Sequence, residues 1–204
     1  MDGLLFAYAN FCVPGTQRVA ELAEPDVILA SHVLDDDPES SGTIQGTFSQ
    51  NGISAITLEL CNGNEWHAPT IQRGVDYIHR LMIDMGIRSN GEGPATAYEP
   101  DLSKTLVARV SHAVPARYGG WVDTLVIPGQ KVQPGQVLGN VLNSWGDVLE
   151  EVVSPVEGLV LLIPRNPGME AGRPVAVLVY EDIEGVDTEK GIEFSSRFPY
   201  EKQI

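Results

Sequence analysis

Residues 52–60, Gly-Ile-Ser-Ala-Ile-Thr-Leu-Glu-Leu, constrain the fold of this chain more than any other stretch. Their near-continuous apolar run is typical of a strand that is covered on both faces in an α/β sheet. Glu59 is the only carboxylate in the run, and its burial is costly unless it is paired, hydrogen-bonded or turned toward a metal or a cleft. In open α/β sheets the cleft lies beyond the carboxyl ends of the strands, where Glu59 is expected. Glu59 is therefore a candidate site residue, and a core glutamate satisfied by an arginine or by backbone amides is the alternative.

Strands and helices alternate on either side of that run. Residues 4–11 and 26–30 are predicted as strands, joined by a helix that Thr16 caps and Pro25 ends. This repeated order predicts βαβ units and a parallel sheet.

Two further helices are predicted around the central strand. Residues 43–50 are expected to form a short helix with Ile44 and Phe48 turned inward. Residues 69–85 have the strongest helical pattern in the chain, with apolar residues at steps of four and three: Ile71, Val75, Ile78, Met82 and Met85. We therefore predict a partial α/β domain over residues 1–90.

The pattern changes after a Gly- and Pro-rich linker at residues 91–103. A β domain is predicted over residues 104–181, followed by a charged tail at 182–204. Short apolar strands separated by turns are typical of an all-β sandwich or barrel. The expected strands are 106–110, 120–125, 136–142, 150–153, 158–163 and 175–179.

Two segments of the β domain, residues 120–139 and 155–179, repeat one arrangement of strand and Gly turn. This repeat is typical of the two halves of a biotinyl/lipoyl-like barrel-sandwich. Carrier proteins of that fold hold their cofactor on a lysine at the hairpin tip between the halves. Here the tip at 143–147 reads Asn-Ser-Trp-Gly-Asp and Lys131 lies in an internal turn, so a non-carrier relative is predicted.

The charge and the ends of the chain limit the classes of partner. There are 28 acidic and 13 basic residues, which leave a formal charge of -15. Such a charge repels phosphate backbones and anionic membrane surfaces, so neither nucleic acid nor membrane is expected as a partner. With no leader sequence, no apolar stretch of membrane-spanning length and two isolated cysteines, a cytoplasmic protein is predicted.

The order of these segments resembles a known family. The 52–60 strand and a helix ending in Met-Gly-Ile precede three motifs: Ala-Arg-Tyr-Gly-Gly-Trp-Val, Pro-Gly-Gln-Lys-Val-Gln-Pro-Gly-Gln and Gly-Asp-Val-Leu-Glu-Glu-Val-Val-Ser-Pro-Val-Glu-Gly. This ordered set is similar to the C-terminal part of the succinylglutamate desuccinylase/aspartoacylase family. The resemblance implies a carboxypeptidase-like α/β domain and a C-terminal β domain. It also implies zinc-dependent hydrolysis of the amide of an N-acyl amino acid or related small molecule.

Glu59 matches the family's general base, which takes a proton from the zinc-bound water and passes it to the leaving amine. The family's zinc ligands come from a His-x-x-Glu motif and a later histidine. That motif is absent from this chain, and the last ligand would fall upstream of Met1. His67, close to Glu65, is the best substitute ligand among the four histidines, and Cys61 replaces a family glycine; the other histidines are His32, His79 and His112.

A sheet that lacks its first strands would expose a hydrophobic edge. We therefore expect a homo-oligomer or a complementing N-terminal polypeptide as partner. Two other functions remain open at this point. The chain could be a non-catalytic binding or assembly module in which Glu59 is a relic, and a biotin or lipoyl carrier is disfavoured by the missing tip lysine.

Overall fold

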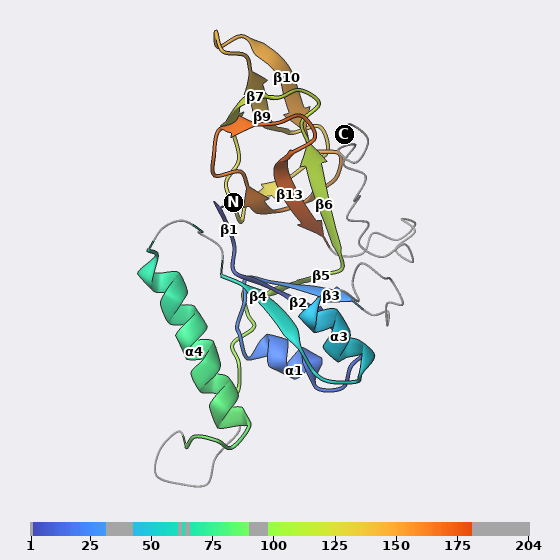
Figure 1. The fold of residues 1–204 in the computed structure, drawn as a ribbon. Helices are drawn as coiled ribbons and strands as arrows, with labels where there is room; N and C mark the ends of the chain where they lie inside the picture. The colour runs from blue at the N-terminus through green and yellow to red at the C-terminus, as the bar shows by residue number, and fades with distance from the viewer. Residues whose placement is uncertain (1, 32–42, 61–62, 64–65, 90–97, 181–204) are drawn as a thin grey trace, which may run out of the picture. The chain divides into compact units, whose positions relative to one another are not determined.

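The computed structural model describes residues 2–31, 43–60, 63, 66–89 and 98–180. These residues form two compact units, each treated separately below (Figure 1). The α/β unit lies within residues 4–108, and the β unit comprises residues 2, 3 and 109–180. The predicted combination of an α/β part and an all-β part is confirmed.

The α/β unit contains a four-stranded mixed sheet in the order β4-β2-β3-β5. Strands β2 (Phe6–Asn10), β3 (Val27–Ser31) and β5 (Leu106–Ala108) are parallel, as the alternation of strands and helices predicts. Strand β4 (Ile56–Glu59) is antiparallel to β2 and lies at one end of the sheet. The first crossover, from β2 to β3, contains α1 (Thr16–Glu21).

The predicted strand over residues 106–110 is wrong, because it is divided at Arg109. Its first part is β5, which pairs with β3 in the α/β unit. Its second part begins β6 (Val110–Pro115), which pairs with a strand of the β unit. The Arg109 N–H donates to the Tyr180 carbonyl, so the chain joins the β unit at this residue. One apolar run therefore supplies strands to two different sheets.

Helix α3 (Ile44–Gln50) begins where the sequence indicates, because the Thr43 hydroxyl accepts a hydrogen bond from the Gly46 N–H at 2.9 Å. The predicted inward face of this helix is wrong. Ile44 is 77% exposed and Phe48 is 41% exposed.

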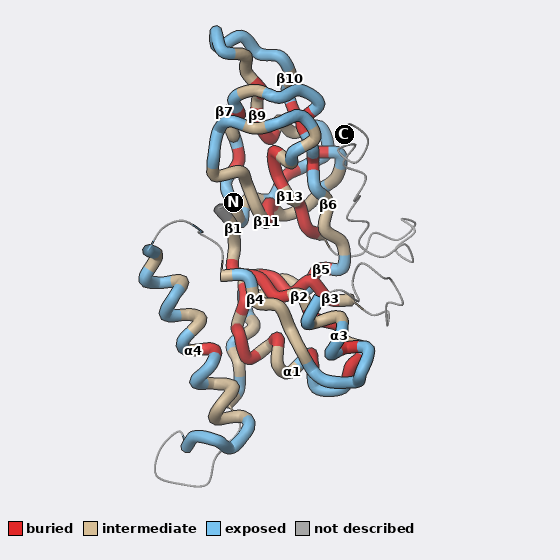
Figure 2. The backbone as a smooth tube through the Cα atoms, viewed as in Figure 1, coloured by how far each residue is buried: buried red, intermediate tan, exposed pale blue. Residues whose placement is uncertain are grey.

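Helix α4 (Ala68–Asp84) has the predicted bounds to within one residue, with a proline in its first turn. It stands beside β4 (Figure 1), and only Tyr77 on it is buried (Figure 2). The tyrosine packs with Leu22 and Ala23 after α1, and with partly buried Leu58 on β4. The helix thus contributes one buried residue, Tyr77, to this core, with partly buried Leu81 packed against it.

The β unit consists of two antiparallel sheets. The larger sheet has the order β1-β11-β13-β6, with β8 paired to β11, and its other strands are β1 (Asp2–Gly3), β8 (Lys131–Val132), β11 (Gly158–Ile163) and β13 (Pro174–Tyr180). The smaller sheet has the order β10-β9-β7-β12: β7 (Gly120–Thr124), β9 (Val137–Leu142), β10 (Val148–Val153) and β12 (Gly168–Met169).

Side chains of both sheets share one core in the β unit. Leu138 and Val141 from β9 pack with Val160 from β11 and Leu178 from β13, and all four are fully buried. Neither sheet closes into a barrel in the part of the chain that the structure describes. A two-sheet β unit is therefore established, and the biotinyl/lipoyl-like barrel-sandwich stays a prediction.

No helix among the described residues has both the length and the hydropathy needed to span a membrane.

Candidate functional site

Glu59 is the last residue of β4, and its surroundings differ from those the sequence predicts. The residue is exposed, and the other residues of β4 are only half-buried, so the prediction of a strand covered on both faces is wrong. The physical reason is that β4 pairs with one neighbour only, β2, among the described strands. A strand at the end of a sheet has no neighbouring strand along its outer edge, so its side chains are covered less than those of a central strand.

The predicted position beyond the carboxyl ends of the parallel strands is also wrong. Because β4 is antiparallel to β2, its last residue is level with the first residue of that strand, and Glu59 is paired with Phe6. Phe6 in turn is paired with Val27 at the start of β3. Glu59 therefore lies at the amino ends of the two parallel strands, where the cleft rule for open parallel sheets does not apply.

Apolar residues continue across the sheet from Glu59. Paired residues in neighbouring strands share a face, so Glu59, Phe6 and Val27 form one row on the same side of the sheet. Phe6 and Val27 are buried, and the Phe6 ring meets Tyr8 edge-on with ring centroids 5.3 Å apart. Within the described residues the Glu59 carboxylate has no hydrogen-bond or ion-pair partner. It is thus a solvent-accessible carboxylate at the end of an apolar row.

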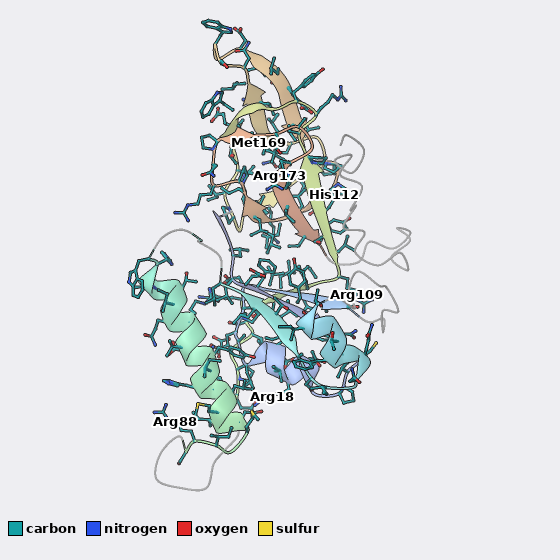
Figure 3. The ribbon with its side chains drawn as sticks, viewed as in Figure 1. Arg18, Arg88, Arg109, His112, Met169 and Arg173 are labelled. Carbon is teal, nitrogen blue, oxygen red and sulfur yellow. The ribbon has the colours of Figure 1, made fainter. Side chains whose placement is uncertain are left out.

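Three arginines of the α/β unit are held by the unit itself. Arg18 on α1 pairs with Asp84 on α4 at 2.6 Å, which raises the pKa of the guanidinium, and it lies where these helices meet (Figure 3). Arg73 pairs with Asp26 at 3.0 Å. Arg80 donates to carbonyls that follow α1. Each arginine therefore has a structural role, and none is available as a clamp for a substrate carboxylate.

The turn after α1 is the point on which these contacts converge. Glu24 has a φ of 46°, a left-handed conformation that is uncommon for a non-glycine residue. Its carboxylate accepts from the Tyr98 hydroxyl at 2.7 Å and pairs with Arg80 at 3.1 Å, and its carbonyl accepts from Arg73. The hydrogen bond to Glu24 is the main reason why the pKa of Tyr98 is raised.

Sequence reasoning missed this arginine-rich face of α4. Arg73, Tyr77, Arg80 and Asp84 recur at steps of four, three and four, which is helical spacing. That signal was readable in the sequence, but apolar residues at the same spacing on another side of the helix dominated the prediction.

The histidines are not brought together with Glu59 into a metal site. His67 lies at the N-cap of α4, with Nδ1 2.5 Å from the Thr70 hydroxyl oxygen. His79 is exposed on α4, and His112 lies on β6 in the β unit. His32, Cys61 and Glu65 lie outside the described residues.

Zinc, the metal implied by the resemblance, needs three or four ligands from protein side chains. The described residues contain no group of three or more His, Cys, Asp or Glu side chains that could hold a metal ion. They therefore do not fit a zinc site on their own.

Comparisons with known proteins give a clear result for structure and none for sequence. No protein-family model matches the sequence, and no curated protein sequence matches it. Solved structures do match. The ectoine utilization protein EutE of Ruegeria pomeroyi has a TM-score of 0.71 and 18% identity, and the match covers 87% of this chain and 55% of that protein.

Two further structures carry the family name. For the succinylglutamate desuccinylase/aspartoacylase of Rhodobacter sphaeroides, the TM-score is 0.68 at 18% identity, and coverage is 89% of this chain and 54% of the other. For a succinylglutamate desuccinylase from a Silicibacter species, the TM-score is 0.70 at 14% identity, and coverage is 88% of this chain and 54% of the other. The predicted resemblance is confirmed at the level of the fold, and the chain spans about half the length of these proteins.

Proposed function

We propose that this chain, which has the fold of succinylglutamate desuccinylase/aspartoacylase proteins, forms part of a hydrolase that cleaves the amide of an N-acyl amino acid or a related small molecule. The observation that carries the proposal is the shared fold at a TM-score of about 0.7 with proteins of that family name. Glu59, exposed and unpaired among the described residues at the end of β4, is the residue that we assign to the chemistry.

The chemical role of Glu59 is that of a general base and then a general acid. An ionised carboxylate takes a proton from a water molecule as its oxygen attacks the amide carbonyl carbon. The carboxylic acid then returns that proton to the amine nitrogen as the carbon–nitrogen bond breaks. The products are a carboxylic acid, which then releases its proton to water, and an amine, and Glu59 ends in its starting state.

The described residues do not supply a complete zinc site, so any metal ligands come from elsewhere in the assembled enzyme. Arg18, Arg73 and Arg80 are already occupied by partners within the α/β unit, so they are not the groups that bind the substrate carboxylate. We further propose a cytoplasmic setting, which is supported by the two isolated cysteines of the sequence.

Hydrolysis of a panel of N-acetyl and N-succinyl amino acids by the assembled enzyme, that is, this chain together with the polypeptide that completes its fold, with zinc added, tests the proposal through the amine released. We expect turnover that falls by about 100-fold or more in Glu59→Gln, because general-base catalysis contributes this much. Glu157→Gln is the matched control, since Glu157 is an exposed glutamate of the β unit. Circular dichroism of each variant must show an unchanged fold.

The alternative is a non-catalytic binding or assembly module, and the lack of a three-ligand group in the described residues favours it. Absence of turnover above background, together with less than one bound zinc per chain after dialysis, would support this alternative. Turnover that is equal in the wild type and in Glu59→Gln would refute the role of Glu59.

A further inference from the structure

Glu59 lies at a position where strand pairing ends. It is the last residue of β4, and β4 pairs with only one of the described strands. Its partner in that pairing, Phe6, is the first residue of β2. The end of a strand ladder opens more readily than its middle. A carboxylate that acts on a bound substrate needs a fixed position, so contacts other than this ladder must hold Glu59 in place.

Asp26, the residue before β3, holds the chain where β2 begins. Its carboxylate oxygen Oδ2 accepts a hydrogen bond from the Leu5 N–H at 2.8 Å. Its own N–H donates to the Leu5 carbonyl at 2.8 Å, and its carbonyl accepts from the Leu106 N–H at 3.0 Å. Leu5 is buried and immediately precedes Phe6. Both backbone groups of Leu5 are therefore bonded to Asp26, one residue away from the strand partner of Glu59.

The same carboxylate is held from α4 by Arg73. Nη1 of this arginine lies 3.0 Å from Asp26 Oδ2, and Nη2 lies 3.2 Å from Oδ1, so two nitrogens meet the two carboxylate oxygens. Nη2 also donates to the Glu24 carbonyl at 2.9 Å. A two-point contact of this kind fixes the orientation of a carboxylate as well as its position. Arg73 thus holds Asp26 where it can accept from the Leu5 N–H.

Helix α4 also packs against the residues on either side of Glu59 in the chain. A Cβ added to Gly74 on α4 would lie 3.1 Å from the Leu60 side chain, so the helix backbone approaches Leu60 closely. Leu58 packs in the same cluster as Tyr77 of α4. Both chain neighbours of Glu59 therefore depend on the placement of this helix.

Strand pairing, a hydrogen bond, an ion pair and a packing contact together form a closed ring of contacts. Its members, in order around the ring, are Glu59, Phe6, Leu5, Asp26, Arg73, Gly74 and Leu60. We infer that Arg73 and Asp26 are positioning residues for Glu59, because their ion pair closes this ring and holds the end of β4 in place. The inference rests on the proposed function, since a fixed position serves catalysis only if Glu59 takes part in it.

The ion pair should act locally rather than on the stability of the whole α/β unit. The side chains of Arg73 and Asp26 are 39% and 35% exposed, so water screens their attraction. The largest fully buried side chains of the unit are not members of the ring; they are Leu22, Ile28 and Leu29. Loss of the ion pair is therefore expected to loosen the end of β4 without unfolding the unit.

Backbone nitrogen relaxation, measured by NMR on the full chain, tests the inference without turnover. We expect an order parameter of about 0.85 for the Glu59 N–H in the wild type and below about 0.6 in Arg73→Met. The N–H of Ile56, at the other end of β4, should stay at about 0.85 in both proteins. Asp26→Asn should give a similar loss at Glu59. The double variant should give no further loss, because both single changes remove the same ion pair.

Arg18→Met is the matched control. The Arg18 guanidinium also joins α4 to the rest of the unit through one carboxylate and one carbonyl, those of Asp84 and Tyr98. Asp84 is the last residue of α4, whereas Arg73 lies in the first half of the helix. Arg18→Met should therefore leave the order parameter of the Glu59 N–H at about 0.85.

Kinetics of the assembled enzyme add a readout that a purely structural role would not move. Arg73→Met should lower kcat by about 10-fold with KM unchanged, because a small displacement of the base slows the chemistry and leaves substrate binding intact. An assembled enzyme without turnover would refute the proposed function, and the order parameters would still decide whether Arg73 positions Glu59.

Three results would overturn the inference. The first is a Glu59 N–H that is already disordered in the wild type or is unchanged by Arg73→Met. The second is an equal loss of order at Glu59 in Arg73→Met and Arg18→Met. The third is an active enzyme in which Arg73→Met raises KM and leaves kcat unchanged.

Discussion

Replacement of Arg80 by methionine should destabilise the α/β unit by about 3 kcal/mol, estimated from bonds made by a charged donor. Arg80 Nε donates to the Leu22 carbonyl at 2.7 Å, and Nη2 donates to the Ala23 carbonyl at 3.1 Å. Its Nη1 also pairs with Glu24 at 3.1 Å, and the guanidinium lies 5.5 Å from the centre of the Tyr98 ring. The arginine thus caps the carboxyl end of α1 and fixes the strained turn that follows.

The size of this destabilisation is estimated from the two hydrogen bonds that Arg80 donates to the Leu22 and Ala23 carbonyls. The Arg80 side chain is only 14% exposed, so screening by water is limited. Each hydrogen bond from a charged donor contributes about 1.5 kcal/mol at the lower end of its range. The ion pair and the ring contact add less, because Glu24 keeps its bond from Tyr98 and methionine still packs on the ring. Arg80→Lys keeps the positive charge but not the planar guanidinium that reaches both carbonyls, so we expect about half the loss of unfolding free energy.

Urea unfolding followed by far-ultraviolet circular dichroism measures this loss, because the helices of the described chain all lie in the α/β unit. With a slope of about 2 kcal/mol per molar urea, the midpoint should fall by about 1.5 M in Arg80→Met. Arg88→Met is the control, since Arg88 is exposed just after α4 (Figure 3). A loss below about 1 kcal/mol, or an equal loss in the control, would refute the capping role.

Three further outcomes are expected. Leu138→Ala should cost about 3 kcal/mol in thermal unfolding of the β unit, because Leu138 is fully buried between the two sheets. Gly120→Ala should cost about 2 kcal/mol or more in the same assay, because its Cβ would lie 2.3 Å from the Leu142 carbonyl oxygen. The hydrogen bond from the Tyr98 hydroxyl to Glu24 raises the pKa of Tyr98 above its ordinary value of 10.0, so this bond stabilises the fold fully at pH values below 10.0. The contribution is lost as the pH rises through the higher pKa of the folded state. When the pH is raised through the pKa of folded Tyr98, the free energy of unfolding measured by denaturant titration should therefore fall less in Tyr98→Phe than in the wild type. Curves of unfolding free energy against pH that run parallel for the two proteins would contradict this.

The strands of the β unit could be predicted from the sequence because their signals are local. Apolar residues alternate with turn residues over short distances, and glycine marks the turns, so β9, β11 and β13 have bounds close to the predicted ones. The family resemblance was also visible, since it depends on the order of such segments. The helical periodicity of α4 was equally clear.

The location of Glu59 could not be predicted in the same way. An apolar run indicates a strand, but it does not indicate how many neighbours the strand has or in which direction they run. The sequence predicted a covered strand with Glu59 at a carboxyl-end cleft. Pairing of β4 with β2 alone, in the antiparallel direction, made it an exposed residue at the opposite end.

The orientation of α4 shows the same division. Periodicity determined by itself that residues near 68–84 form a helix with an apolar side. Only the tertiary structure decided which side faces inward, because that choice depends on distant acceptors: Asp26, Glu24 and the carbonyls after α1. Hydrogen bonds and ion pairs to those groups hold Arg73 and Arg80 inward, and the apolar side of α4, with Ile71, Val75 and Ile78, is left exposed as a consequence.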